Sequence, residues 1–167
     1  MARVDPDLLT VGIDASPRRI GWAVNIGGDI ILADTWHVDK IRDIRDRREA
    51  WVHIRDAIRT AERVHRRDLH RIAIEDSYLG PNRKGSLDLA RTIGHVEAWA
   101  IVSYPYVSLT RMPAATWRSL CGISGQGKAA SLEYANQYRK QYGIVDDQDT
   151  ADAICIAIAA ARLDAEE

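Results

Sequence analysis

Four acidic residues stand where the chain is otherwise apolar or where a helix is expected to begin. Asp14 ends the apolar segment TVGID, and Glu75 ends the segment RIAIE. Asp149 and Asp152 lie three residues apart at the start of a long apolar segment, so a helix would place them on one face. A charge beside a buried strand is unfavourable unless it has a partner. Each acid therefore requires solvent, a structural partner or a ligand.

Gathered at one place, four carboxylates would repel one another unless cations lay between them. Carboxylate oxygens favour Mg²⁺ or Mn²⁺, whereas the chain has no Cys/His cluster that suits zinc. Two such ions about 4 Å apart bind the attacking and leaving oxygens in phosphoryl transfer. The structural alternative stays open, because an acid that ends a strand is often a turn residue. Acids that begin a helix also cap it, which applies to Asp146, Asp147 and Asp149.

The elements that must position these acids follow from the hydrophobic pattern. Alternation and short apolar runs predict five strands, at 8–14, 20–26, 30–38, 71–75 and 106–110. Three- and four-residue apolar spacing predicts four helices, at 39–65, 85–103, 128–142 and 150–163. This order predicts an α/β fold, a mixed five-stranded sheet flanked by helices, in one domain over residues 1–167. Strand ends of such a sheet meet at one edge, where ligands collect.

Charge is unevenly distributed along a chain of 167 residues whose net charge is −1. Residues 77–145 hold eight Lys or Arg and three acids, which indicates a surface for phosphates or, alternatively, solvated helix faces. No apolar run reaches the roughly 18 residues that span a bilayer, so no membrane partner is expected. Cys121 and Cys155 lie in apolar segments and are expected to be buried free thiols in the cytoplasm.

The acidic motifs, taken in order, resemble the RuvC family of Holliday junction resolvases. The segments that carry the resemblance are GIDASPRRIGWAV, IAIEDSYL, LCGISGQGKAA and DTADAICIAIAA. The resemblance implies an RNase H-like fold and a homodimeric endonuclease of DNA recombination and repair that nicks four-way DNA junctions symmetrically. It also implies that Asp14, Glu75, Asp149 and Asp152 are catalytic and bind Mg²⁺, with two ions in each site and Mn²⁺ able to substitute.

The same resemblance assigns DNA contacts. Tyr78 falls where the family stacks an aromatic ring on bases, and Lys128 matches a catalytic basic residue near the scissile phosphate. Arg118 stands one position late for a second basic residue, with Trp117 in the expected place. A stacking role for Trp117 is a further alternative. The residues expected to bind DNA are Tyr78, Arg83, Lys84, Arg118 and Lys128.

Two other functions fit the same residues. The first is a nuclease of the same fold that acts on flaps, forks or other branched DNA, since a change in the loops that face DNA would leave the acids in place. The second is a junction-binding protein without catalysis, in which the acids only cap helices. Substitution of Glu75 distinguishes an enzyme from a binding protein, because only cleavage requires its charge.

Overall fold

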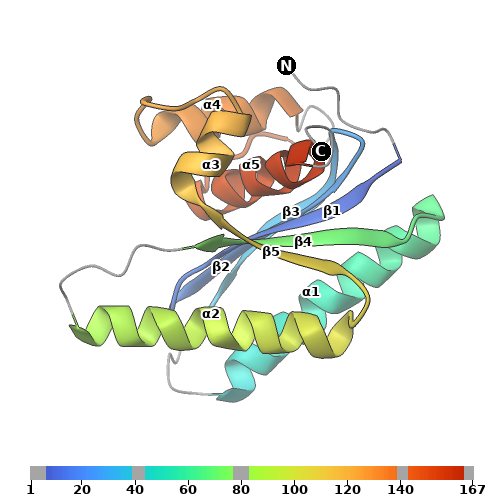
Figure 1. Cartoon of the computed structure of the whole chain (residues 1–167), viewed down its shortest axis with the longest axis vertical. Helices are drawn as coiled ribbons and strands as arrows, with labels where there is room; N and C mark the ends of the chain where they lie inside the picture. Colours follow the sequence, from blue (N-terminus) through green and yellow to red (C-terminus); the bar gives the residue numbers. More distant parts are fainter. Residues whose placement is uncertain (1–6, 39–43, 77–82, 139–142, 164–167) are drawn as a thin grey trace.

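The computed structural model describes residues 7–38, 44–76, 83–138 and 143–163, and Figure 1 shows their arrangement. A central sheet has the strand order β3-β2-β1-β4-β5. Its strands are β1 (Leu9–Ala15), β2 (Arg19–Ile26), β3 (Asp29–His37), β4 (Leu69–Asp76) and β5 (Ser108–Pro113). The first three pair antiparallel, while β4 runs parallel to β1 and β5 runs parallel to β4. The predicted mixed five-stranded sheet is confirmed.

A tight turn joins β2 to β3. Gly27 and Gly28 there have φ angles of 59° and 99°, which residues with a Cβ adopt only with strain. This turn sets the register of the antiparallel hairpin and places Arg19, the first residue of β2, at the sheet edge where β1 ends.

Helices cover both faces of the sheet (Figure 1). One face carries α1 (Ile44–His65) and α2 (Arg83–Ser103). The other carries α5 (Gln148–Leu163), with α3 (Ala114–Leu120) and α4 (Ala129–Tyr138) packed on it. Buried residues accordingly form two clusters, one on each side of the sheet. Within the described chain, no helix has the length and apolar character required to cross a membrane.

The structure corrects both ends of the last predicted strand and adds one helix that was not predicted. The strand predicted at 106–110 begins instead at Ser108 and continues to Pro113, because its pairing with β4 determines where it ends. The short helix α3 follows directly and is absent from the prediction. Its seven residues are too few to show a helical period. Cys121 and Cys155 are buried free thiols, as predicted.

Two of the four predicted helices extend into residues that the structure does not describe. Residues 39–43 of the first predicted helix and 139–142 of the third lie there. α1 accounts for the remainder of the first, and α4 for the remainder of the third except Lys128, which lies in the turn before it. The last predicted helix is confirmed as α5, which begins two residues earlier than expected.

Candidate functional site

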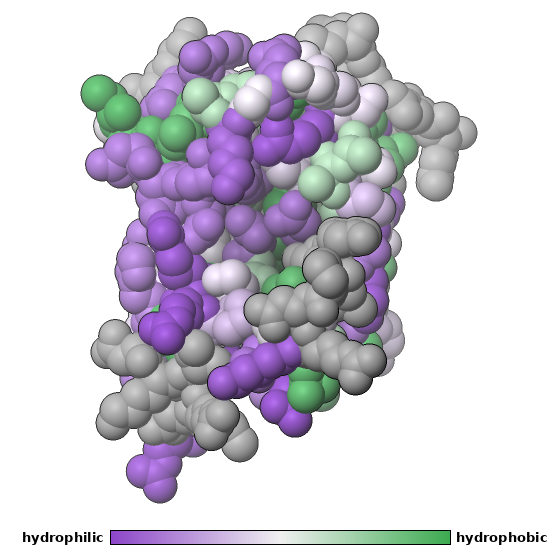
Figure 2. Space-filling model, turned by 90° about the vertical axis from the view of Figure 1, so that its left-hand side faces the viewer, coloured by the Kyte–Doolittle hydropathy of each residue, from purple (hydrophilic) through white to green (hydrophobic). Residues whose placement is uncertain are grey.

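Parallel pairing of β1 with β4 brings Asp14 and Glu75 to the same edge of the sheet. Ile13 pairs with Ile74, so the next residue on each strand lies at the same level. Alternation along β1 directs Asp14 to the face that α5 covers, as it does Thr10, whose hydroxyl donates to the Ala157 carbonyl at 2.8 Å. The two acids are therefore neighbours on one face, as the strand-end pattern predicted. Figure 2 looks onto this end of the molecule, which is largely hydrophilic.

Two glycines let α5 approach the sheet at backbone distance. A Cβ added to Gly12 of β1 would lie 2.2 Å from the Ala153 carbonyl oxygen. A Cβ on Gly21 of β2, the partner of Asp14 across the strand pair, would lie 2.2 Å from the Asp149 carbonyl oxygen. Any side chain at these positions would push the helix outward. Both glycines are thus needed to hold the first turns of α5 beside Asp14.

The pKa of Asp14 reflects the charges of acids from β4 and α5 near it. Burial, followed by the charge of Glu75 and a hydrogen bond with it, raises the pKa of the Asp14 carboxyl well above its usual range. Asp152 and Asp149 raise the pKa of Asp14 further. Burial also raises the pKa of Asp152, an effect that hydrogen bonds with Ser131 and Gln148 partly offset. The fold therefore concentrates negative charge at a partly dehydrated place.

Arg19 is a contributor that the sequence analysis missed. It forms ion pairs with Asp147 and Asp149, the latter with 2.5 Å between Nε and Oδ2. Burial raises the pKa of Asp149, and the Arg19 charge opposes that rise. The double arginine at 18–19 was the available signal, but nothing local indicates which acids it meets.

Asp147 has the structural role that the capping alternative predicted. Its carboxylate accepts hydrogen bonds from the Thr150 backbone N–H at 2.9 Å and from the Thr35 hydroxyl at 2.7 Å. Burial alone would raise the pKa of Asp147, but these hydrogen bonds and the Arg19 charge hold it below its usual range. Asp147 therefore caps α5 and ties its first turn to β3.

The donor set suits a hard divalent cation, although its side chains are not gathered around one point. All four groups offer carboxylate oxygens, which Mg²⁺ and Mn²⁺ prefer. Among the described residues, no three His, Cys, Asp or Glu side chains have an arrangement that could hold a metal ion. Asp149 is paired with Arg19, and Asp152 accepts a hydrogen bond from Gln148 at 2.9 Å. The backbone positions of the four acids and their carboxylate oxygens fit such a cation. The side chains of Asp149 and Asp152 would have to rotate toward it.

The residues predicted to bind DNA differ in exposure and in their distance from the acids, and some lie outside the described residues. Lys84 and Lys128 are exposed, at the start of α2 and just before α4. Arg118 on α3 lies close enough to the acids that its charge lowers the pKa of Asp152, against the larger effect of burial. Tyr78 and the side chain of Arg83 lie outside the described part of the chain. Their predicted roles stay predictions.

Trp117 is placed where it cannot stack on DNA bases. Its side chain is buried in the cluster beneath α5, and the guanidinium of Arg118 lies 4.7 Å from its ring centroid. The stacking alternative is therefore wrong, because the ring belongs to the core.

The fold is that of RuvC-type resolvases, an RNase H-like architecture. The chain is similar to T. thermophilus RuvC in complex with a Holliday junction substrate, with a TM-score of 0.71, 16% identity, and coverage of 95% of this chain and 96% of that one. A second Thermus thermophilus RuvC structure matches with a TM-score of 0.66, 13% identity, and coverage of 91% and 92%. The yeast mitochondrial Holliday junction resolvase Ydc2 matches with a TM-score of 0.57, 12% identity, and coverage of 98% and 81%.

Family membership rests on sequence. Residues 24–162 match the model of the family described as Lactococcus phage M3 protein, and the chain belongs to that family. No curated protein sequence matches the chain.

Proposed function

We propose that this protein is a metal-dependent endonuclease that resolves four-way DNA junctions by paired, symmetric nicks. The observation that carries the proposal is the convergence of Asp14 and Glu75 with the acidic first turns of α5. The fold likeness to a RuvC bound to a Holliday junction substrate supports the same assignment. Recombination and repair are the processes in which such an activity would act.

Asp14, Glu75, Asp149 and Asp152 would hold Mg²⁺, with Mn²⁺ able to substitute and two ions in each site. Bound there, the cation would supply Lewis acidity toward a phosphodiester. The protonation state of Asp14 is the first contribution of the chain's own residues. Because the pKa of Asp14 is raised by burial and by Glu75, the Asp14 carboxyl holds a proton more readily than a free carboxyl does and would release it when a cation binds.

Basic residues would orient the DNA backbone relative to these acids. Arg118 adds positive charge beside Asp152, and exposed Lys128 would contact the scissile phosphate. Arg83 and Lys84 would contact phosphates further along the strand, and Tyr78 would stack on bases at the open centre of the junction. Phosphate contacts of this kind make affinity fall steeply as salt rises.

A homodimer is part of the proposal, because two symmetric nicks require two sites related by a two-fold axis. The outer face of α2 offers exposed apolar side chains for this contact, namely Leu87, Ile101 and Val102. Val102 is 81% exposed, so Val102→Glu should leave the monomer folded and weaken dimerisation. Sedimentation over a range of protein concentrations measures this, and an unchanged dimer would place the contact elsewhere.

The decisive experiment compares Glu75→Gln with Asp76→Asn. Asp76 is the adjacent acid at the same strand end, and its exposed side chain makes a long 3.9 Å ion pair with Arg111. Glu75→Gln should bind a synthetic four-way junction and fail to cut it with Mg²⁺, while Asp76→Asn cuts normally. Cleavage by Glu75→Gln at the wild-type rate would refute the assigned site.

The substrates used with the wild-type protein separate the remaining alternatives. Four-way junctions, flaps, forks and plain duplex are offered at equal concentration with Mg²⁺ or EDTA. Preference for the four-way junction supports the proposal, and preference for flaps or forks favours the alternative nuclease. Binding without cleavage of any substrate would favour the non-catalytic alternative.

A further inference from the structure

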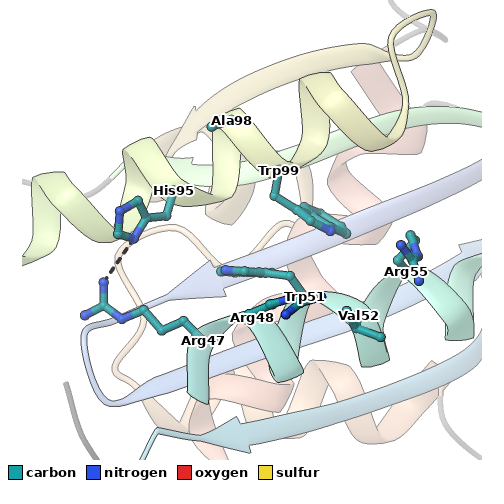
Figure 3. Close-up of a pocket in the computed structure, with 8 residues that line it drawn as sticks. All are labelled: Arg47, Arg48, Trp51, Val52, Arg55, His95, Ala98 and Trp99. Atoms are coloured by element: carbon teal, nitrogen blue, oxygen red, sulfur yellow. Dashed lines mark hydrogen bonds between the residues drawn. The ribbon is translucent and has the colours of Figure 1, made fainter. Parts of the chain in front are cut away.

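A cavity of about 270 Å³ opens between α1 and α2, on the face of the sheet opposite to α5 (Figure 3). None of the residues proposed to bind metal or DNA lines it. The lining residues are Arg47, Arg48, Trp51, Val52, Arg55, His95, Ala98 and Trp99. Among the described residues, three arginines and no acid line this cavity, so it needs an explanation separate from the carboxylate site.

Within the described ranges, the buried guanidinium of Arg47 has no carboxylate partner. Arg47 is only 7% exposed, and its Nη1 lies 3.2 Å from the His95 Nδ1 (Figure 3). Its Nε has no hydrogen-bond partner in the described structure. A buried guanidinium without a carboxylate is strongly unfavourable, and proteins retain one where it has a function. Arg47 therefore indicates an anionic ligand.

No described residue that lines the cavity supplies that anion. Arg55 at the other end of the cavity already pairs with Asp56, with 3.0 Å between Nη2 and Oδ1. Arg48 has an exposed side chain and stands beside Arg47 on α1, so the two present positive charge to the same cavity. An anion with several oxygens, such as a phosphate, can accept from both guanidinium groups.

Aromatic side chains form the rest of the cavity wall. Trp51 from α1 and Trp99 from α2 point toward each other, with ring centroids 5.2 Å apart and planes inclined by 30°. This spacing leaves no room for a ring between them, so a planar group would lie against their outer surface. The Trp51 Nε1 is buried without a hydrogen-bond partner among the described residues. Val52 and Ala98 complete an apolar boundary.

We propose that this cavity binds a nucleotide, with its phosphate at Arg47 and Arg48 and its base against the tryptophans. The volume is close to the lower end for small-molecule sites, about 300 Å³, and suits one nucleotide rather than a longer ligand. The nucleotide is either free or part of a DNA strand. The site needs no metal, so it stands independently of the proposed nuclease activity.

Calorimetric titration of the full chain in EDTA tests the proposal. The probes are deoxyadenosine monophosphate, deoxyadenosine, inorganic phosphate and tetradeoxyadenylate. The variants are Arg47→Met and Trp99→Leu. Arg63→Met is the matched control, because Arg63 is an exposed arginine in the last turn of the same helix. Removal of a charged hydrogen bond or of the stacking surface should weaken binding about tenfold or more, and the control should bind as the wild type does.

Thermal unfolding separates loss of a ligand contact from loss of the fold. Without ligand, Arg47→Met should unfold at a higher temperature than the wild type, because it removes an unpaired buried charge. Deoxyadenosine monophosphate should raise the unfolding temperature of the wild type and the control but not that of Arg47→Met. A lower unfolding temperature for ligand-free Arg47→Met would overturn the inference, since Arg47 would then be a structural residue.

The titration outcomes separate the sources of the nucleotide. Equal binding of the monophosphate and tetradeoxyadenylate supports a free nucleotide, and binding of tetradeoxyadenylate alone, lost in both variants, supports a nucleotide within a strand. Three results would overturn the proposal: no binding of any probe, unchanged binding by both variants, or inorganic phosphate binding as tightly as the nucleotide. A dimer lost in Trp99→Leu without nucleotide binding would also overturn it and assign the wall to a second copy.

Discussion

The two faces of the sheet are built from side chains of different size and charge. On the α5 face, small residues dominate the contact, and Gly12 and Gly21 allow backbone-to-backbone approach. On the α1–α2 face, isoleucines, leucines and tryptophans fill the interface, and a cavity remains between the two helices. The first face gathers carboxylates, whereas the second gathers guanidinium groups.

This difference shows how packing determines which chemistry a surface can hold. Small residues bring α5 close enough for acids on separate elements to influence one another's pKa. Large side chains keep helices farther from the sheet, and gaps between bulky rings become cavities. A substitution that affects one face should therefore leave the other largely unchanged.

The largest expected effect comes from Asp14→Asn, which removes charge from the α5 face without changing its shape. Junction cleavage should fall by about three orders of magnitude, or about 4 kcal/mol in activation free energy. The measurement is single-turnover cleavage of a four-way junction in Mg²⁺. Asp29→Asn, at the opposite end of the sheet, serves as the control and should cut normally. Normal cleavage by Asp14→Asn would show that the carboxylates only shape the fold.

The same variant has a pH-dependent effect on stability. Because the pKa of Asp14 is raised, its protonated form stabilises the fold at low pH, and this contribution is lost as pH rises through the raised value. Asparagine stays neutral, so in EDTA at about pH 8 the variant should unfold at a higher temperature than the wild type. The gain should shrink toward about pH 4, where ordinary aspartates titrate. Thermal unfolding followed by circular dichroism measures both, and a constant difference would exclude Asp14 as its source.

Gly12→Ala should have the largest effect on stability. The added Cβ would meet the Ala153 carbonyl oxygen at 2.2 Å, so α5 must move away from β1, which should cost about 3 kcal/mol or more. Gly94→Ala is the matched control, since that helical position on the other face has open space. Alanine there should stabilise by up to about 1 kcal/mol. Urea unfolding gives both values, and equal stability of the two variants would contradict the close approach of α5.

Asp147→Ala should have an intermediate effect, because it removes the cap of α5 and its bond to Thr35. The expected loss is about 1–2 kcal/mol at pH 7. The pKa of Asp147 is lowered, so its contribution is present above the usual aspartate range and lost as pH falls through the lowered value. Asp146→Ala, an exposed neighbour, should change stability by less than about 0.5 kcal/mol. Urea unfolding from pH 7 down to the lowest pH at which the wild type stays folded tests this, and a difference that stays constant over the whole range would assign the loss to another cause.

Tyr104→Phe should have the smallest effect and concerns the α1–α2 face. The Tyr104 hydroxyl donates to the Arg55 carbonyl at a long 3.3 Å, and burial raises its pKa to about 12. Loss of this bond should cost less than about 1 kcal/mol and leave junction cleavage unchanged. Urea unfolding and the cleavage assay provide the two readouts, and reduced cleavage would show that the two faces are coupled.

Local patterns predicted much of the fold. The N-terminal hairpin follows from alternation and from the Gly27-Gly28 pair, and the burial of α5 follows from its continuous apolar segment. The neighbouring positions of Asp14 and Glu75 follow because parallel strands end at one edge. The metal-binding roles of the four acids stay predictions.

Contacts between segments that are distant in the sequence could not be predicted from local patterns. Arg19 meets Asp147, 128 residues away, and no local spacing indicates that pairing. The end of β5 depends on β4, and the α1–α2 cavity depends on how two separate helices pack. Each of these features appears only when the tertiary arrangement is known.

α5 packs against the central strands of the sheet, yet it is translated after all the other described helices and strands. A ribosome that has made everything through α4 has produced Asp14 and Glu75 but neither acid of α5, and the alanine-rich layer that shields β1 is still missing. Such a nascent polypeptide lacks two of the four proposed ligands for Mg²⁺. Premature termination before Gln148 would therefore release a product without the proposed cutting activity, and any such activity can arise only after α5 has been translated.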